Sequence, residues 1–442
     1  MRKFFFIVIQ LILITLLFSF LINNNFIISF EIKDFIYSVS SEYIFIFLLV
    51  VFIVIFIFQS FYFKSKYQIS KFLIFNKIKK KEKGYTSFVN GMFALANKDF
   101  KKAISESKKV DNYLQENKSL SLLLKSEVYK IEKKYPELHN IYEQMIKNES
   151  TQNLGYRGLM EQYLRAQDYH HAFIYGEKLF NNNPQVDKIY ETLVGILSKT
   201  NNWQQLINIS DKALSKRVAD KSICESNKSI AYYEISKIKR YSELKDSIYF
   251  IKQSLKLRKN FPPYIKLYLE LLIQNKDYNI AKKFFKKAWS ENPHPEYKSL
   301  LSTLAINLKM ELSNLTRFVV GSNKNNYESK VLLVESLIST KKWSEARNQI
   351  KDLLDLQPKK EVCILMSKIE EGDSGDVQKI NAWNMRSKNG EENNMWVCVI
   401  TKRNQKVWSS VSEGGYFNTL EWKKPMILNQ FNDELEVISN DN

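Results

Sequence analysis

A short phrase recurs five times along the body of this chain. In each copy a polar residue precedes an aromatic residue, and a small or aliphatic residue follows three positions later. The copies are Asp99-Phe100 with Ala103, Asp168-Tyr169 with Ala172, Asn202-Trp203 with Leu206, Asp277-Tyr278 with Ala281, and Lys342-Trp343 with Ala346. Residues three apart share one helix face, and a small residue there lets a second helix approach closely. The phrase therefore predicts helices packed in pairs.

The spacing of the copies is regular in the first half of the body. Tyr135, Tyr169 and Trp203 lie 34 residues apart, which is the period of the tetratricopeptide repeat. In three copies a proline, which ends a helix of about four turns, follows the aromatic residue by 15 positions. These prolines are Pro184, Pro293 and Pro358. A generic helical bundle would explain the apolar periodicity but not this fixed register.

Each helix pair leaves an apolar face that only the next pair can cover, so the pairs should stack into a curved array. We expect a TPR-like α-solenoid over residues 65–370, with the first repeat near 85–115. After Trp203 the period drifts, since Tyr241 and Tyr278 lie 37 residues apart. The unit expected near residue 312 cannot be read from the sequence.

Composition agrees with an all-α body in a reducing compartment. Only 12 Gly and 8 Pro occur in 442 residues, which favours long helices over many strands and tight turns. The three cysteines, Cys224, Cys363 and Cys398, form no framework of paired spacings.

Two uncharged apolar runs precede the repeats. Phe4 to Ile22 and Tyr43 to Phe63 are each long enough, at about 1.5 Å per residue, to cross a hydrocarbon core of about 30 Å. A cleaved signal peptide is the alternative for the first run, but the run shows no small-x-small cleavage site and exceeds the usual apolar length. We therefore expect residues 1–64 to form a hairpin of two transmembrane helices.

Basic residues beside the runs predict the orientation of the hairpin. Arg2 and Lys3 precede the first run, and eight lysines lie between residues 64 and 83. The connecting segment, residues 23–42, holds a single lysine and three carboxylates. Because basic residues are retained on the cytoplasmic side, both termini should be cytoplasmic.

The net charge of +19 raises the question of nucleic-acid binding. Many of the charges flank the apolar runs, where attraction to anionic lipid explains them. The chain lacks the interleaved aromatic and glycine motif of a nucleic-acid module, so no nucleic-acid partner is expected. It also lacks a phosphate-binding glycine loop, a Gly-x-Ser-x-Gly elbow, a His-Glu-x-x-His motif and a flavin fingerprint, so we expect a protein that is not an enzyme.

Three segments together resemble the HemY family of bacterial inner-membrane proteins. They are Lys81 to Ala103, Leu154 to Asp168 (with Leu154, Gly155, Arg157, Gly158 and Leu159 at the motif positions), and Ala288 to Pro295. The resemblance covers nearly the whole chain. It implies a TPR protein with two membrane passes in the bacterial inner membrane, acting at a late step of protohaem synthesis.

The resemblance extends to the tail and departs from the family there. Some relatives end in a zinc ribbon with two Cys-x-x-Cys pairs, and its pattern is carried here by Trp396, Cys398, Trp408, Gly415, Asn418, Thr419, Leu420 and Trp422. The other three ligand positions hold Thr401, Val411 and Gly414. One thiol cannot hold a zinc ion. We therefore expect a linker at 371–395 and a degenerate, metal-free ribbon-like tail at 396–442, its tryptophans packed in a small β-like lobe or on the last repeat.

The suspected pathway also directs attention to haem ligands and docking residues. His170, His171 and His294 are candidate haem ligands, with a surface or capping role as the alternative. We expect no resident cofactor, although haem or porphyrin could be a ligand. Arg157, Tyr163 and Arg165 are candidate partner-binding residues on the first helix of a central unit, and Arg157 could instead brace adjacent repeats.

These features predict a scaffold that gathers late haem-pathway proteins at the membrane or hands over porphyrin. Confinement raises the effective concentration of bound partners without new chemistry. Membrane lipid is an expected partner, and self-association stays open. Three alternatives compete: an enzyme of porphyrin metabolism, a lipopolysaccharide-assembly repeat protein with a single span and an intact rubredoxin-like ribbon, and a cytochrome c maturation repeat protein whose repeats lie outside the cytoplasm.

Overall fold

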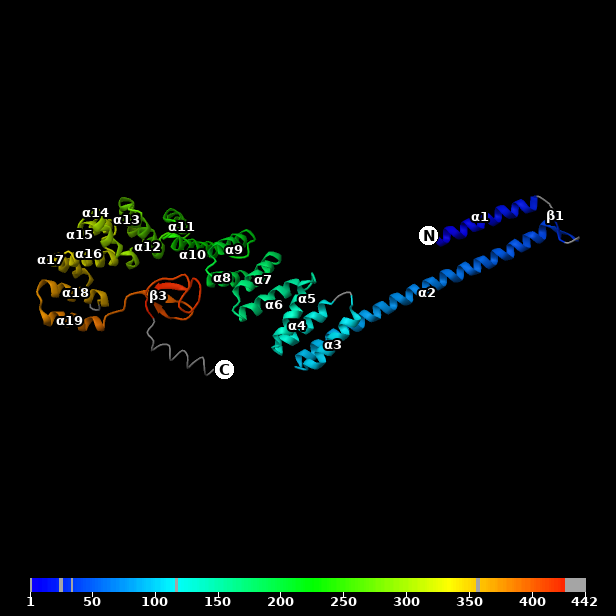
Figure 1. Ribbon diagram of the computed structural model, residues 1–442, viewed down its shortest axis with the longest axis horizontal. Helices are drawn as coiled ribbons and strands as arrows, with labels where there is room; N and C mark the ends of the chain where they lie inside the picture. The colour runs from blue at the N-terminus through cyan, green and yellow to red at the C-terminus, as the bar shows by residue number, and fades with distance from the viewer. Residues whose placement is uncertain (1, 24–26, 33–34, 116–117, 355–357, 426–442) are drawn as a thin grey trace. The chain divides into compact units, whose positions relative to one another are not determined.

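The computed structural model describes residues 2–23, 27–32, 35–115, 118–354 and 358–425. The chain divides into two compact units, Met1–Lys134 and Tyr135–Asn442. Figure 1 shows the helices and strands of both units.

Two helices joined by a β-hairpin begin unit 1. Helix α1 spans Arg2–Asn23, strands β1 (Ile27–Ile32) and β2 (Phe35–Ser40) pair antiparallel, and α2 runs unbroken for 56 residues from Ser41 to Ala96. The hairpin lies where the sequence analysis expected only a short acidic loop. Its β-branched and aromatic residues favour strands, so the all-α expectation misses this element.

The described residues contain one helix that is long and apolar enough to cross a membrane, Glu42–Ala96, which includes the second expected span. The first expected span lies within α1, where the apolar helix Val8–Phe20 is shorter than a membrane span requires. The expectation of two transmembrane helices is therefore supported for one helix only.

The C-terminal end of α2 is also the first helix of the repeat region. Helices α3 (Phe100–Tyr113) and α4 (Ser119–Ile131) pack on its last turns. Ala94, Ala103, Leu124 and Val128 form the small core between the three helices. The helix that carries the long apolar run therefore continues without a break into the first helix pair.

Unit 2 is a TPR-like array in which each helix packs on the next in chain order (Figure 1). Its helices are α5 (Tyr135–Ile146), α6 (Gln152–Arg165), α7 (Tyr169–Asn182), α8 (Ile189–Lys199), α9 (Trp203–Ser215), α10 (Lys221–Lys239), α11 (Leu244–Leu257), α12 (Pro262–Gln274), α13 (Tyr278–Glu291), the 3₁₀ turn η1 (Pro295–Tyr297), α14 (Leu300–Leu308), α15 (Leu312–Val320), α16 (Tyr327–Ser339), α17 (Trp343–Ile350), η2 (Lys351–Leu353), α18 (Lys360–Asp373) and α19 (Val377–Lys388).

The recurring phrase marks the start of the second helix in five of the helix pairs. Its aromatic residue is the first residue of α3, α7, α9, α13 and α17. The residue three positions later, alanine in four copies and Leu206 in the fifth, is fully buried in every copy. The pair that could not be read from the sequence is α14 with α15, in which Leu312 replaces the aromatic residue. Leu315 occupies the buried position there.

The polar residue of the phrase caps the second helix in three copies, at Asp99, Asp168 and Asn202. The first helix ends at a residue with positive φ, such as Gln167 at 58° or Lys276 at 63°. The following amide closes the turn, as when Asp168 N donates to Tyr163 O at 2.9 Å. This is a Schellman-type cap that usually carries glycine at the left-handed position. Asp168 then accepts a hydrogen bond from the amide of His171 and caps the second helix.

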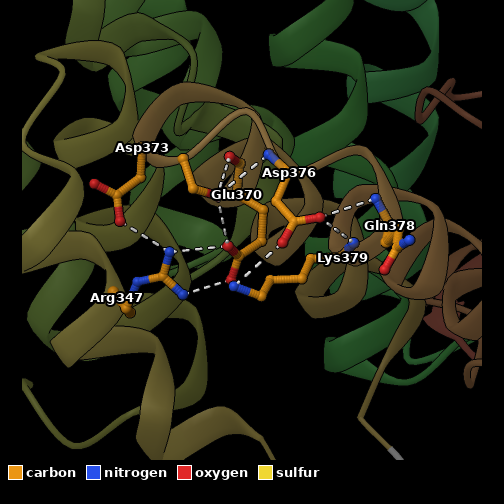
Figure 2. Close-up of polar contacts among 7 residues, drawn as sticks. Arg347, Glu370, Asp373, Asp376, Gln378 and Lys379 are labelled. Carbon is orange, nitrogen blue, oxygen red and sulfur yellow. Dashed lines mark hydrogen bonds and ion pairs between the residues drawn. The ribbon is translucent and has the colours of Figure 1, made fainter.

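An ion-pair network joins the last repeats (Figure 2). Arg347 of α17 forms a bidentate pair with the buried carboxylate of Glu370 on α18, and its Nη2 atom also lies 2.9 Å from Asp373 Oδ2. Asp376 accepts hydrogen bonds from the first amides of α19, Gln378 N and Lys379 N. The segment 371–395, expected as a linker, thus contains a capped helix that packs on α18.

A small β lobe follows α19. Strands β3 (Met395–Cys398), β4 (Asn404–Gln405) and β5 (Leu420–Lys423) form an antiparallel sheet in the order β4-β3-β5. Trp408 packs edge-on against Phe261 and Tyr233, at centroid distances of 5.2 and 5.3 Å. Trp396 Nε1 donates to Glu296 Oε2 at 3.1 Å.

The β lobe therefore docks on α10, the start of α12 and η1, in the middle of the array. The alternative that the tryptophans pack on the last repeat is wrong, because their ring partners Tyr233 and Phe261 belong to the middle of the array. Residues 426–442 of the expected tail lie outside the described residues.

Candidate partner-binding surface

Helices α5, α6 and α7 form the surface that holds most of the candidate residues. Two glycines on α6 let α5 approach closely. An ideal Cβ on Gly155 would lie 2.8 Å from the carbonyl oxygen of Tyr142, and one on Gly158 would lie 2.3 Å from its ring. The Leu-Gly-x-Arg-Gly-Leu segment is therefore explained by helix packing.

A column of rings runs along this surface, and we call it the aromatic column: His139, Tyr156, Tyr163, His171 and Tyr175. Tyr163 lies at its centre. It stacks on His171 at a centroid distance of 5.0 Å and an interplanar angle of 23°, and on Tyr175 at 5.7 Å and 6°. His139 meets Tyr163 edge-on at 5.9 Å, and Tyr156 lies 6.4 Å from Tyr175. Three helices thus contribute rings to one cluster of neighbouring rings, in which Tyr163 stacks on His171 and Tyr175.

Asp168 fixes the orientation of the His171 ring. Its carboxylate accepts the amide of His171 at 3.1 Å and lies 2.7 Å from His171 Nδ1. The bond from the backbone amide, followed by the bond from the ring, lowers the pKa of Asp168. The carboxylate that caps α7 therefore stays charged and holds the ring against Tyr163.

A hollow of about 730 Å³ opens beside the aromatic column. It is lined by Tyr135, Pro136, His139, Asn140, Gln162, Tyr163, Arg165 and Ala166. Gln162 links α6 to α5 beside the hollow. Its amide nitrogen donates to Tyr135 O at 3.2 Å, and its amide oxygen lies 3.2 Å from His139 Nδ1. The Arg165 guanidinium lies 5.9 Å from the centroid of the Tyr135 ring.

Cations flank the rings on both sides. Lys178 Nζ lies 5.4 Å from the Tyr175 centroid and 6.0 Å from that of Tyr156, and Arg165 borders the hollow. Burial raises the pKa of the Tyr175 hydroxyl, so this ring remains neutral. Half-buried aromatic rings beside exposed cations suit flat or extended ligands and the aromatic anchors of a protein partner.

The structure brings together some of the candidate residues and separates others. Tyr163 and His171 are in direct contact, and Arg165 borders the same hollow. His170 is exposed and meets His171 edge-on at 5.4 Å. Arg157 is exposed and pairs with Glu161 one turn along α6, at 3.0 Å.

His294 lies elsewhere, beneath the β lobe. It is buried against Trp422, at a centroid distance of 4.5 Å, and its Nδ1 atom accepts the amide of Glu296 at 3.1 Å. Burial lowers its pKa to about 4, so the imidazole is neutral. His294 therefore caps η1 and packs against the lobe, whereas His170 and His171 lie on α7.

Cys398 is buried inside the β lobe, where Thr401 and Gly414 also approach each other. Its Sγ atom accepts the amide of Thr401 at 3.5 Å and lies 3.4 Å from Thr419 Oγ1. Burial alone would raise its pKa, but hydrogen bonds from Thr401 and Thr419 outweigh burial and lower it to about 6. Among the described residues no group of three or more His, Cys, Asp or Glu side chains is arranged to hold a metal ion.

Tyr156, Tyr175 and His139 belong to the aromatic column and were missed by the sequence analysis. One signal was present, because Tyr156 and Tyr163 lie seven residues apart and so share a face of α6 over two turns. The stacking of Tyr175 and His139 on that face depends on the packing of three helices and has no local signal.

Comparisons with known proteins leave the family open. No family model matches the chain, and no curated protein matches it. The solved structures that are similar include helical-repeat proteins of low identity. One is Naa15/Naa10 bound to HypK-THB, with 12% identity and a TM-score of 0.39, covering 70% of this chain and half of that chain.

Two further solved structures are similar to parts of the chain. The TPR2AB domain of yeast Sti1 in complex with pHSP90 has 10% identity and a TM-score of 0.29, covering 69% of this chain and 98% of that one. A tetratricopeptide repeat protein from Parabacteroides merdae has 13% identity and a TM-score of 0.26, covering 56% of this chain and 99% of that one. These scores are too low to transfer a partner or an activity.

Proposed function

We propose that this chain is a non-enzymatic scaffold that holds a protein partner on the surface of α5, α6 and α7, close to a membrane. The aromatic column beside the 730 Å³ hollow supports this proposal most directly. Tyrosine and arginine are among the residues most enriched at the energetic centres of protein interfaces. Here Tyr163 is held by stacking on His171, whose ring is oriented by Asp168. The long apolar helix α2 supplies the anchor.

The nature of the partner follows from the resemblance to the HemY family. We infer that the scaffold acts at a late step of protohaem synthesis in a bacterial inner membrane, with its repeats on the cytoplasmic side. Haem-pathway enzymes are the proposed partners, and porphyrin is a proposed ligand of the stacked rings. A reporter fused after Asn442, which lies outside the described residues, tests the orientation.

A binding experiment tests the scaffold with purified full-length protein. The late haem-pathway enzymes of the same organism are reconstituted with it in vesicles, and both binding and turnover are measured. Tyr163→Ala with Tyr175→Ala should weaken binding more than tenfold, because two hot-spot rings cost about 2 kcal/mol or more. Tyr241→Ala removes an equally large but highly exposed ring on the turn before α11 and is the matched control.

The result separates the scaffold from the enzyme hypothesis. Loss of binding in the double variant but not in Tyr241→Ala supports the scaffold. Binding to none of these enzymes, with no effect on their turnover, contradicts it. Turnover of a porphyrin by this protein alone would identify an enzyme instead.

A second candidate is envelope assembly of the lipopolysaccharide type. One observation favours it, because the described residues contain one helix of membrane-spanning length, as in that family. The single thiol of the β lobe argues against it, because that family carries an intact metal ribbon. Porphyrin profiling and lipid analysis of a deletion strain distinguish the two: accumulation of a late porphyrin supports the haem pathway, and altered envelope lipid with unchanged porphyrins supports the second candidate.

A further inference from the structure

The segment of α2 that follows the apolar run carries large apolar side chains that are exposed. These residues are Tyr67, Ile69, Phe72, Leu73, Ile74, Phe75 and Ile78, and each is between 58% and 65% exposed. They lie beyond Phe63, where the membrane-spanning stretch ends in sequence. So many large apolar side chains exposed in one short segment mark a contact with lipid or protein.

The same segment is strongly cationic. Residues 64–83 contain eight lysines and one carboxylate, Glu82. The lysines do not gather on one face of the helix but alternate with the apolar side chains around it. A second copy of this chain would bring its own lysines against these, so like charges oppose self-association through this segment. An anionic lipid surface matches both the charge and the apolar residues.

A hollow of about 240 Å³ lies at the far end of this segment, between α2 and the end of α3, and we call it the lysine hollow. The described residues that line it are Lys77, Lys80, Lys81, Tyr85, Tyr113, Leu114 and Gln115, with no carboxylate among them. Gly84 lies against Leu114, which lines the hollow. An ideal Cβ on Gly84 would lie 2.6 Å from Leu114 Cγ, so glycine at this position lets the end of α3 approach α2 closely.

We propose that residues 74–81 of α2 lie in the headgroup layer of the membrane and at its surface, and that the lysine hollow binds the phosphate of an anionic phospholipid. The ammonium groups of Lys80 and Lys81, two phenols and one amide are donors suited to phosphate oxygens. The proposal rests on the membrane anchoring of the proposed function and adds the lipid class and the residues that bind it.

The length of α2 is compatible with this position. From Tyr43 to Ile78 the helix is about 53 Å long, whereas a bilayer with both headgroup layers is about 40–45 Å thick. A tilt of about 35°, within the observed range for transmembrane helices, brings this whole length into the bilayer. The lysine hollow then lies at its surface, within a Debye length of about 8–10 Å of the phosphates.

The test places a fluorophore at two positions of the full-length protein. The native cysteines, Cys224, Cys363 and Cys398, are buried and free, so maleimide dyes react with an introduced cysteine. An environment-sensitive dye is attached at Ile74→Cys, in the proposed headgroup layer, and at Asn90→Cys, an exposed control further along α2. Emission is measured in phosphatidylcholine vesicles with a minority of phosphatidylglycerol, and carbonate-resistant vesicle association is measured in parallel.

The proposal expects a blue-shifted emission at position 74 and water-like emission at position 90. Quenching at position 74 by brominated phosphatidylglycerol should exceed quenching by brominated phosphatidylcholine at equal mole fraction by about threefold or more. Lys80→Gln with Lys81→Gln should abolish the excess. Lys101→Gln with Lys108→Gln, which removes two exposed lysines of α3 away from the hollow, should leave it unchanged.

Several results would overturn the proposal while leaving the anchor intact. One is water-like emission at position 74 from protein that still resists carbonate extraction. Equal quenching by both lipids, or an excess that survives Lys80→Gln with Lys81→Gln, excludes the lipid site. Loss of the excess on adding inorganic phosphate, but not chloride at equal ionic strength, identifies a site for free phosphate instead. A blue shift at position 74 that persists in detergent, together with crosslinked dimers, identifies a second copy as the occupant.

Discussion

Gly155 gives a sharp test of how the helices pack. An ideal Cβ there would lie 2.8 Å from Tyr142 O and 2.9 Å from Ile146 N, both backbone atoms of α5. Ordinary contacts between such atoms are about 3.4 Å or longer, so Gly155→Ala must push the two helices apart by about half an ångström. Backbone cannot rotate aside as a side chain can. Overpacking in Gly155→Ala should therefore lower the free energy of unfolding by about 3 kcal/mol, the upper end of the usual range.

The same substitution also removes a helix-destabilising glycine, which stabilises the helix by about 1 kcal/mol. The net loss for Gly155→Ala is therefore about 2 kcal/mol. Gly195 in α8 is the matched control, because nothing lies within 4 Å of an ideal Cβ there. Gly195→Ala keeps only the favourable contribution and should stabilise its repeat by about 1 kcal/mol.

Hydrogen exchange of the full-length protein in detergent measures both effects locally. Amides of α5 and α6 should exchange about 30-fold faster in Gly155→Ala, whereas amides of α8 should exchange about fivefold slower in Gly195→Ala. Amides of α16 should be unchanged in both variants, because distant repeats are coupled only through their neighbours. Equal, stabilising shifts for the two glycines would refute the close approach of α5 and α6.

Three further predictions concern the caps, the ion-pair network and the β lobe. Gln167→Gly should stabilise its helix pair by about 0.5–1 kcal/mol, seen as slower exchange in α6 and α7, because glycine adopts its φ of 58° without strain. Arg347→Met should cost about 2–3 kcal/mol at neutral pH in denaturant unfolding. Hydrogen bonds from Arg347 lower the pKa of Glu370, so this stability is present above the unfolded pKa of about 4.3 and the difference between the two proteins should vanish as the pH falls through the folded pKa. Trp408→Ala should cost about 3–5 kcal/mol of lobe docking and expose residues 389–394 to limited proteolysis; unchanged cleavage would contradict the packing on Phe261.

Local sequence patterns predicted the helix pairs well. The polar-aromatic-x-x-small phrase marked the first residue of α7, α9 and α13, because capping and the burial of one helix face depend on residues three or four apart. The same patterns failed where no aromatic residue marks the pair, as at Leu312, and where apolar residues form strands, as in β1 and β2. These patterns depend only on neighbours along the chain. They therefore could not show whether the helix ends after Phe63 or continues into the repeat region, as α2 does.

The sequence by itself determined the helical repeats, their caps and a long apolar helix, since each of these is encoded by neighbours along one helix. Only the tertiary structure decided that Tyr163 stacks on His171 and Tyr175, because that contact depends on how α6 packs on α7. It also decided that Trp396 reaches Glu296, 100 residues away in the sequence, and so placed the β lobe on the middle of the array. Contacts between distant segments depend on how the intervening helices pack, and no short pattern encodes that.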